Sequence, residues 1–150
     1  MPNGETHRLV GMAAGGGYAL YRARAQTPGC LILEAVGGVV GGNIGGRLPD
    51  IFEPALHPRH RSLAHGLGPV GGAGYVAISA LDGAQDWLRA QADRRAILRA
   101  NAQTVLEGIW HALLELLCRL GAGALAGFVG GYASHVALDA CTPNGCPIIC

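Results

Sequence analysis

The chain is poor in charged and aromatic residues. Only 14% of its 150 residues are charged and 5% are aromatic. The net charge of +1 gives no strong signal for nucleic-acid binding, which needs a basic surface. The HExxH pair of a zinc peptidase is missing as well. Because a buried carboxylate or imidazole is costly unless it is paired or metal-bound, the few histidines and acids are the first candidates for a site.

The cysteines do not have the spacing of a common zinc site. Three of the five, Cys141, Cys146 and Cys150, lie near the C-terminus, but no CxxC pair is present. They either bind a soft metal, form a disulfide, or belong to a tail of small residues in a reducing compartment. Their role stays open.

Glycine and apolar residues, in contrast, are abundant. The chain has 25 glycines and is 50% hydrophobic. Small residues let helices approach closely, both in membrane bundles and in tight soluble ones. Two uncharged runs, 63–81 and 120–138, approach the ~20 residues that cross a bilayer, although neither is strongly hydrophobic. The sequence therefore leaves two locations open, a membrane and the cytoplasm.

The pattern predicts an all-α, single-domain bundle of about five helices. Glycine and proline clusters separate the apolar segments, and no strand-like alternation is long enough to count. The expected helices cover residues 7–22, 30–42, 62–81, 84–120 and 123–140. The segment 84–104 is polar on nearly all sides, so we expect it either to project into solvent or to pack against another subunit of a homo-oligomer.

One candidate pair lies in the last of these helices. His135 and Asp139 are four residues apart, which places them on the same helix face. An imidazole and a carboxylate so placed either ligate one cation together or orient one another through a hydrogen bond. A simple His–Asp hydrogen bond is the alternative to a metal site.

A second group of candidates lies between residues 50 and 65. His60 and His65 both lie near a helix N-terminus if Ser62 caps that helix, and Arg61 between them suits a phosphate. The alternative is a basic surface loop. Asp50 follows an apolar helix and Glu53 comes three residues later, so these acids and histidines form a plausible half-site.

Taken in order, these pieces resemble a known family. They comprise Thr6-His7, Leu48-Pro49-Asp50, His60-Arg61-x-x-x-His65 and Gly131-Tyr132-x-Ser134-His135-x-x-x-Asp139, which runs into Thr142-Pro143-Asn144-Gly145. This combination is similar to the YdjM family of small bacterial membrane-bound metal-dependent hydrolases. Through it the chain distantly resembles zinc-dependent phospholipase C and P1 nuclease. Phe52 departs from the pattern, since the family often has a second Asp there, and Glu53 is the possible substitute.

The resemblance implies an all-helical metal site at one end of the bundle, in or on the bacterial inner membrane. The expected ligands are His7, Asp50, His60, His65, His135 and Asp139. Histidine and carboxylate ligands without cysteine suit Zn²⁺, with Mn²⁺ or Fe²⁺ as alternatives. Six ligands fit two metals better than one, within a range of one to three ions. The phospholipase-like enzymes also use a His-x-x-x-Glu pair, and His111 and Glu115 have that form, although an ordinary helical ion pair explains them as well.

The resemblance also implies phosphoester hydrolysis by a metal-activated water. On this hypothesis Glu53 is the base that orients the water and Arg61 neutralises the phosphate. Phospholipid, nucleotide and phosphomonoester substrates all remain open, and membrane lipid is an expected partner. The competing interpretation is a non-catalytic membrane-associated or self-assembling helical protein. Its histidines and aspartates would form a structural metal site or a hydrogen-bonded core.

Overall fold

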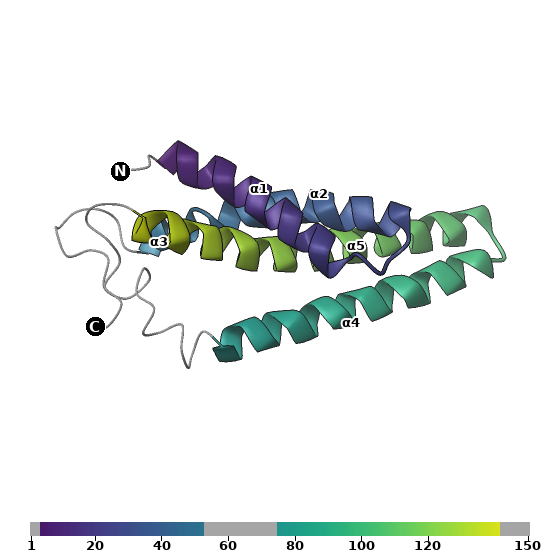
Figure 1. The fold of residues 1–150 in the computed structure, drawn as a ribbon. Helices are drawn as coiled ribbons and strands as arrows, with labels where there is room; N and C mark the ends of the chain where they lie inside the picture. Colours follow the sequence, from purple (N-terminus) through teal and green to yellow (C-terminus); the bar gives the residue numbers. More distant parts are fainter. Residues whose placement is uncertain (1–3, 53–74, 142–150) are drawn as a thin grey trace.

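The computed structural model describes residues 4–52 and 75–141, and these residues form helices without any strand. The elements are α1 (Gly4–Arg22), α2 (Pro28–Gly45), the short α3 (Leu48–Phe52), α4 (Tyr75–Ala100) and α5 (Val105–Ala140). Figure 1 shows α1, α2 and α5 packed together, with α4 lying along α5 and diverging from it toward the end of the bundle at which α1 begins and α5 ends. The prediction of an all-α, single-domain bundle is confirmed.

The C-terminal helices begin and end at other places than we predicted. α4 continues through Asp82 and Gly83, where a break was expected, and α5 continues across residues 120–123. The break lies instead at residues 101–104, where the Thr104 hydroxyl accepts a hydrogen bond of 3.2 Å from the Glu107 amide and caps α5. The expected long helix over 84–120 is therefore a hairpin. Residues 62–74 of the other expected helix lie outside the described part of the chain.

Glycines bring α1, α2 and α5 into backbone contact. A Cβ atom added to Gly41 of α2 would lie 1.9 Å from the Ala124 carbonyl oxygen of α5. One added to Gly127 of α5 would lie 2.0 Å from the Gly38 carbonyl oxygen of α2. No side chain fits at such distances, so only glycine permits this approach. This is the close helix packing that the glycine content predicted.

The same contacts fix the directions of the helices. Gly41 approaches Ala124 and Gly45 approaches Phe128, so α2 and α5 advance in the same direction. α1 runs the opposite way, because Gly11, early in α1, approaches Gly42 late in α2. The start of α1 and the ends of α2 and α5 therefore meet at one end of the bundle.

Ion pairs link α4 to the other helices. Its Arg89 donates to both oxygens of the buried Glu34 of α2, with contacts between 2.6 and 3.2 Å. Asp93 pairs with Arg119 of α5, and Asp82 pairs with Arg22 of α1. α4 thus packs within the same chain, and a further contact of the polar segment 84–104 with another subunit remains a prediction.

Two segments are long and apolar enough to cross a membrane. They are Pro28–Ile51 and Val105–Ala140. The second contains the predicted run 120–138, whereas most of the other predicted run, 63–81, lies outside the described residues. Sequence reasoning missed the first, because Glu34 and Arg47 interrupt its apolar residues. An exposed aliphatic stripe runs along α2 and consists of Ile32, Val36, Val40 and Ile44.

Candidate metal centre

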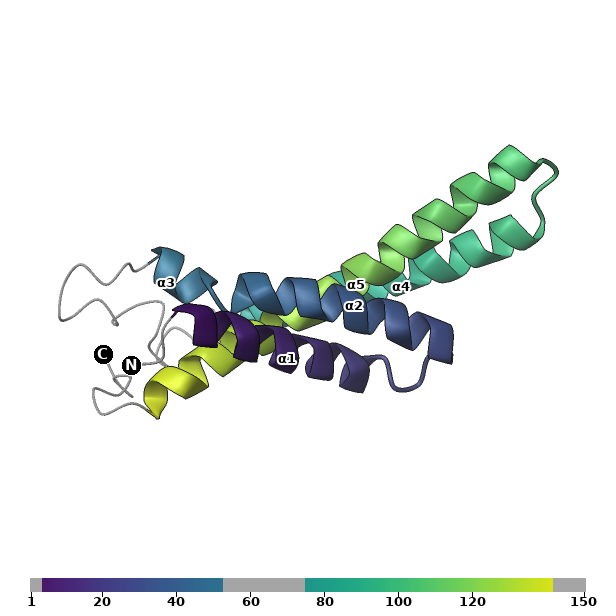
Figure 2. The ribbon, with the colours of Figure 1, turned by 90° about the horizontal axis from the view of Figure 1, so that it is seen from above.

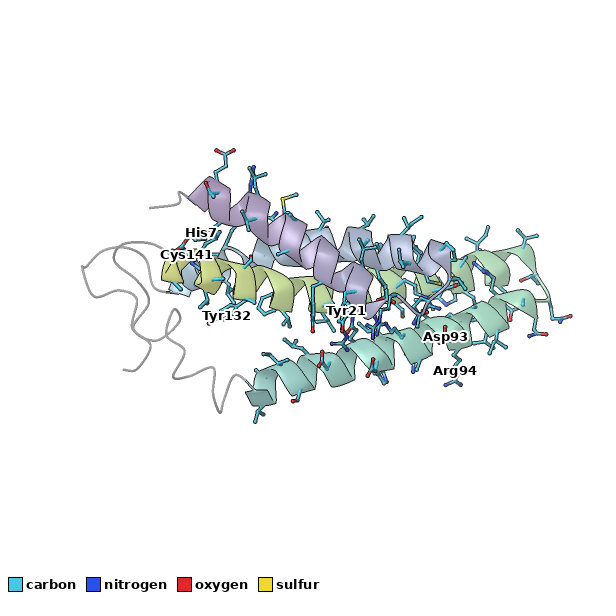
Figure 3. The ribbon with its side chains drawn as sticks, viewed as in Figure 1. His7, Tyr21, Asp93, Arg94, Tyr132 and Cys141 are labelled. Carbon is cyan, nitrogen blue, oxygen red and sulfur yellow. The ribbon has the colours of Figure 1, made fainter. Side chains whose placement is uncertain are left out.

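Four of the six predicted metal ligands meet where three helices end or begin. His7 lies near the start of α1, Asp50 lies in α3, and His135 and Asp139 lie in the last turns of α5. Figure 3 labels His7 near the start of α1 and Cys141 just after α5, at the same end of the bundle. One ligand atom each from His7, His135 and Asp139 lie within 4.8 Å of one another, and all three residues are buried.

A backbone carbonyl orients the His135 ring. The Nδ1 atom of His135 lies 2.8 Å from the carbonyl oxygen of Gly46, the residue that follows α2. A carbonyl oxygen can only accept, so Nδ1 carries the hydrogen. The Nε2 atom then faces two carboxylates, at 3.5 Å from Asp50 Oδ1 and 3.4 Å from Asp139 Oδ2.

Asp139 connects the two histidines. Its Oδ2 faces His135, while its Oδ1 lies 3.4 Å from His7 Nε2. The two imidazole rings stack with their centroids 3.9 Å apart and an angle of 25° between the ring planes. Both Nε2 atoms are therefore directed at the same carboxylate, so Asp139 lies at the centre of the cluster.

The spacing of these atoms matches the donor set of a metal site. Charge-assisted N–H···O hydrogen bonds are usually about 2.7–2.9 Å long. Nitrogen and oxygen ligands at about 2.0–2.1 Å from a tetrahedral metal are themselves about 3.3–3.4 Å apart. The three separations of 3.4, 3.4 and 3.5 Å agree better with the second distance. His7, His135 and Asp139 could thus hold one ion, and Asp50 lies beside one of them, His135.

Asp50 differs from the other members of the cluster in its exposure. Its side chain is 47% exposed, whereas those of His135 and Asp139 are almost wholly buried. Pro49 beside it is buried and anchors α3 against the bundle. Among these four residues, Asp50 is the one whose side chain reaches solvent.

The remaining predicted site residues cannot be placed. His60, His65, Glu53 and Arg61 lie outside the described residues. Their roles therefore remain predictions: the two histidines as metal ligands, Glu53 as the base, and Arg61 as the group that neutralises the phosphate. Sequence reasoning missed the Gly46 carbonyl, since a backbone oxygen leaves no residue-type signal. The only feature of the sequence at this position is a glycine at the end of an apolar helix.

The pair His111 and Glu115 plays no part in this cluster. His111 is 24 residues before His135 on α5, about 36 Å along the helix. Glu115 pairs with Arg99 of α4 at 3.0 Å, and His111 lies 3.9 Å from Glu107. The likeness to the His-x-x-x-Glu pair of the phospholipases is therefore accidental, and the expected ion pair between these two residues is replaced by other partners.

Comparison with known proteins identifies a family. The model of the family described as YdjM inner membrane protein matches residues 1–150, the whole length of the chain. No curated protein and no solved structure matches. The family and the two apolar helices agree on a location in the bacterial inner membrane.

Proposed function

Because the chain belongs to the YdjM inner membrane protein family, we propose that it is a membrane-bound hydrolase that uses a metal ion to cleave a phosphoester. The observation that carries the proposal is the arrangement of His7, His135 and Asp139, with both Nε2 atoms 3.4 Å from one carboxylate. Phosphoester chemistry comes from the family resemblance of the sequence, whereas the ligand set comes from the geometry.

The ligand roles follow from the contacts. His7 and His135 present Nε2, Asp139 presents both carboxylate oxygens, and Asp50 presents Oδ1. The hydrogen bond from His135 Nδ1 to Gly46 fixes the ring and makes Nε2 a better ligand, as partners of metal-binding histidines commonly do. When bound, the ion would polarise a phosphoryl oxygen and lower the pKa of a bound water toward neutrality.

An accessible edge favours a catalytic over a structural role. Structural metal sites are closed by protein ligands, whereas catalytic ones keep a position for water or substrate. Three members of the cluster are buried, but Asp50 reaches solvent. A phosphate could approach at this edge, and Arg61 and Glu53 remain the sequence-based candidates for binding it and for orienting the water.

A hydrogen-bonded His/Asp core is the second candidate, and the stacking of the two imidazole rings favours it. In that case the cluster only stabilises the bundle and the protein has a non-catalytic role in the membrane. Hydrogen bonds from the two imidazole rings to the Asp139 carboxylate would then satisfy these buried polar groups without an ion.

The test is elemental analysis of protein purified in mild detergent without chelator or added metal. We expect one to three equivalents of zinc, manganese or iron, together with hydrolysis of chromogenic phosphomonoester or phosphodiester substrates that is lost on chelation and restored by metal. A metal-free protein would overturn the proposal and leave the hydrogen-bonded core. A bound metal without hydrolysis of any phosphoester would support a structural site instead.

A further inference from the structure

The first half of α5 has an apolar outer face that no described helix covers. Its members recur every three or four residues, as expected for one side of a helix. They are Leu106, Ile109, Trp110, Leu113, Leu116 and Leu117, with 37–79% of their surface exposed. Figure 2 shows that the paired ends of α4 and α5 extend beyond α1 and α2. We call these six residues the outer α5 face.

The opposite side of the same helix segment is polar and faces α4. Glu115 pairs with Arg99, and Arg119 pairs with Asp93. These pairs fix the rotation of α5, because each joins its polar side to α4. The outer α5 face is therefore directed away from α4.

α4 carries exposed charges that require water. The side chains of Asp86, Asp93 and Arg99 are each exposed by half or more, and Arg94 is also exposed. Charged groups are strongly disfavoured in contact with lipid acyl chains. The hairpin thus has one apolar side suited to hydrocarbon and one side on which exposed charges lie beside a few exposed apolar side chains.

We propose that the outer α5 face lies against the acyl chains of the bilayer, while α4 lies on the aqueous side of the hairpin. Three observations select lipid as the occupant. The family is one of inner-membrane proteins, the face belongs to a segment apolar enough to cross a membrane, and the charged partner helix lies opposite. An apolar side backed by a charged one is typical of helices embedded on one side only.

The two tryptophans of the chain provide the test. Trp110 lies on the outer α5 face and Trp87 lies on α4, and both are more than half exposed. The variants Trp87→Phe and Trp110→Phe each leave one reporter. The full-length proteins would be placed in lipid nanodiscs that contain phosphatidylcholine brominated on its acyl chains. Their emission would be compared with that in unbrominated discs, and acrylamide would report exposure to water.

We expect bromine to remove on the order of half of the Trp110 emission, because the apolar face of a helix embedded on one side reaches the acyl chains, and to leave Trp87 almost unchanged. Acrylamide should quench Trp87 more strongly than Trp110. Equal bromine quenching of both residues would place α4 in lipid and overturn the proposal. A Trp110 shielded from both quenchers would show that a second copy or another protein covers the face, which would also overturn it.

A second pair of variants keeps the proposal testable if a tryptophan variant misfolds. Leu113→Glu puts a charge on the outer α5 face, whereas Ala90→Glu puts the same charge on an exposed position of α4. We expect Leu113→Glu to reduce the amount of protein recovered in the membrane fraction and Ala90→Glu to leave it unchanged. Equal recovery of both would contradict the assignment of the lipid side.

Discussion

Glu34 of α2 and Arg89 of α4 form an ion pair in which the carboxylate is completely buried and the guanidinium is nearly so. The two groups share three hydrogen bonds of 2.6–3.2 Å. They join α4 to a helix with which it has almost no backbone contact, since α4 packs chiefly on α5. The pair therefore holds α4 in place through long side chains, in contrast to the glycine contacts of the other helices.

Removing only one partner of this pair should destabilise the protein strongly. Arg89→Leu leaves a buried carboxylate without its counter-charge, and such losses cost about 3–5 kcal/mol. The double variant with Glu34→Leu should recover most of that loss. Unfolding in mixed micelles, followed by circular dichroism, measures both effects. Asp86→Ala, at an exposed neighbour of Arg89, is the control and should change little. Equal stability of Arg89→Leu and the control would contradict the structural role of the pair.

The variant His135→Ala should lose the bound metal. It removes a wholly buried Nε2 that faces both Asp139 and Asp50. The readout is metal per protein after purification without chelator. His111→Ala is the matched control, because His111 lies on the same helix but far from the cluster and should keep its metal. The same metal content in both variants would exclude His135 as a ligand.

Asp139→Asn should lower metal content and hydrolysis together. The change keeps the shape of the side chain but removes the charge that faces both histidines. Since removing groups around a metal commonly costs about 10–100-fold in affinity or activity, we expect a loss at least in this range. Asp86→Asn, on the exposed side of α4, should leave both properties intact. An unchanged metal stoichiometry would remove Asp139 from the ligand set.

Gly41→Ala should destabilise the bundle, whereas Gly17→Ala should not. The new methyl at position 41 would meet the Ala124 carbonyl at 1.9 Å, but at position 17 it would meet nothing within 4 Å. Forced overpacking costs about 1–3 kcal/mol, while alanine is favoured over glycine in an unobstructed helix by up to about 1 kcal/mol. The two variants should thus move the unfolding midpoint in opposite directions. A stable Gly41→Ala protein would argue against backbone contact between α2 and α5.

Helix spacing sufficed to predict that His135 and Asp139 share a face, because both lie on one regular helix. Helix spacing could not predict that His7 and Asp50 join this pair, since they lie on other helices whose packing is decided by contacts distant in sequence. Only the family resemblance joined them to the pair. That resemblance depends on which residues occur in order, and therefore carries information that local periodicity lacks.

The errors in the helix bounds have a physical cause. The glycines near residue 121 predict a break, but Gly123 packs against the Glu34 backbone, and this tertiary contact outweighs the poor helix propensity of glycine. The break at residues 101–104 did have a local signal. Thr104 and Glu107 have the spacing of a capping box, and the Gln103 amide also donates to the Glu107 carboxylate at 3.0 Å.

The parallel course of α2 and α5 has an electrostatic consequence for the cluster. A helix carries a partial negative charge of about half an elementary charge at its C-terminal end. Both helices end at the cluster, and neither has a basic residue in its last turn. Asp139 therefore adds a carboxylate where the aligned peptide dipoles of α2 and α5 already disfavour one, and the N-terminus of α1 opposes them. The backbone itself creates a negative potential at this end of the bundle, which would attract a cation before any side chain bound it.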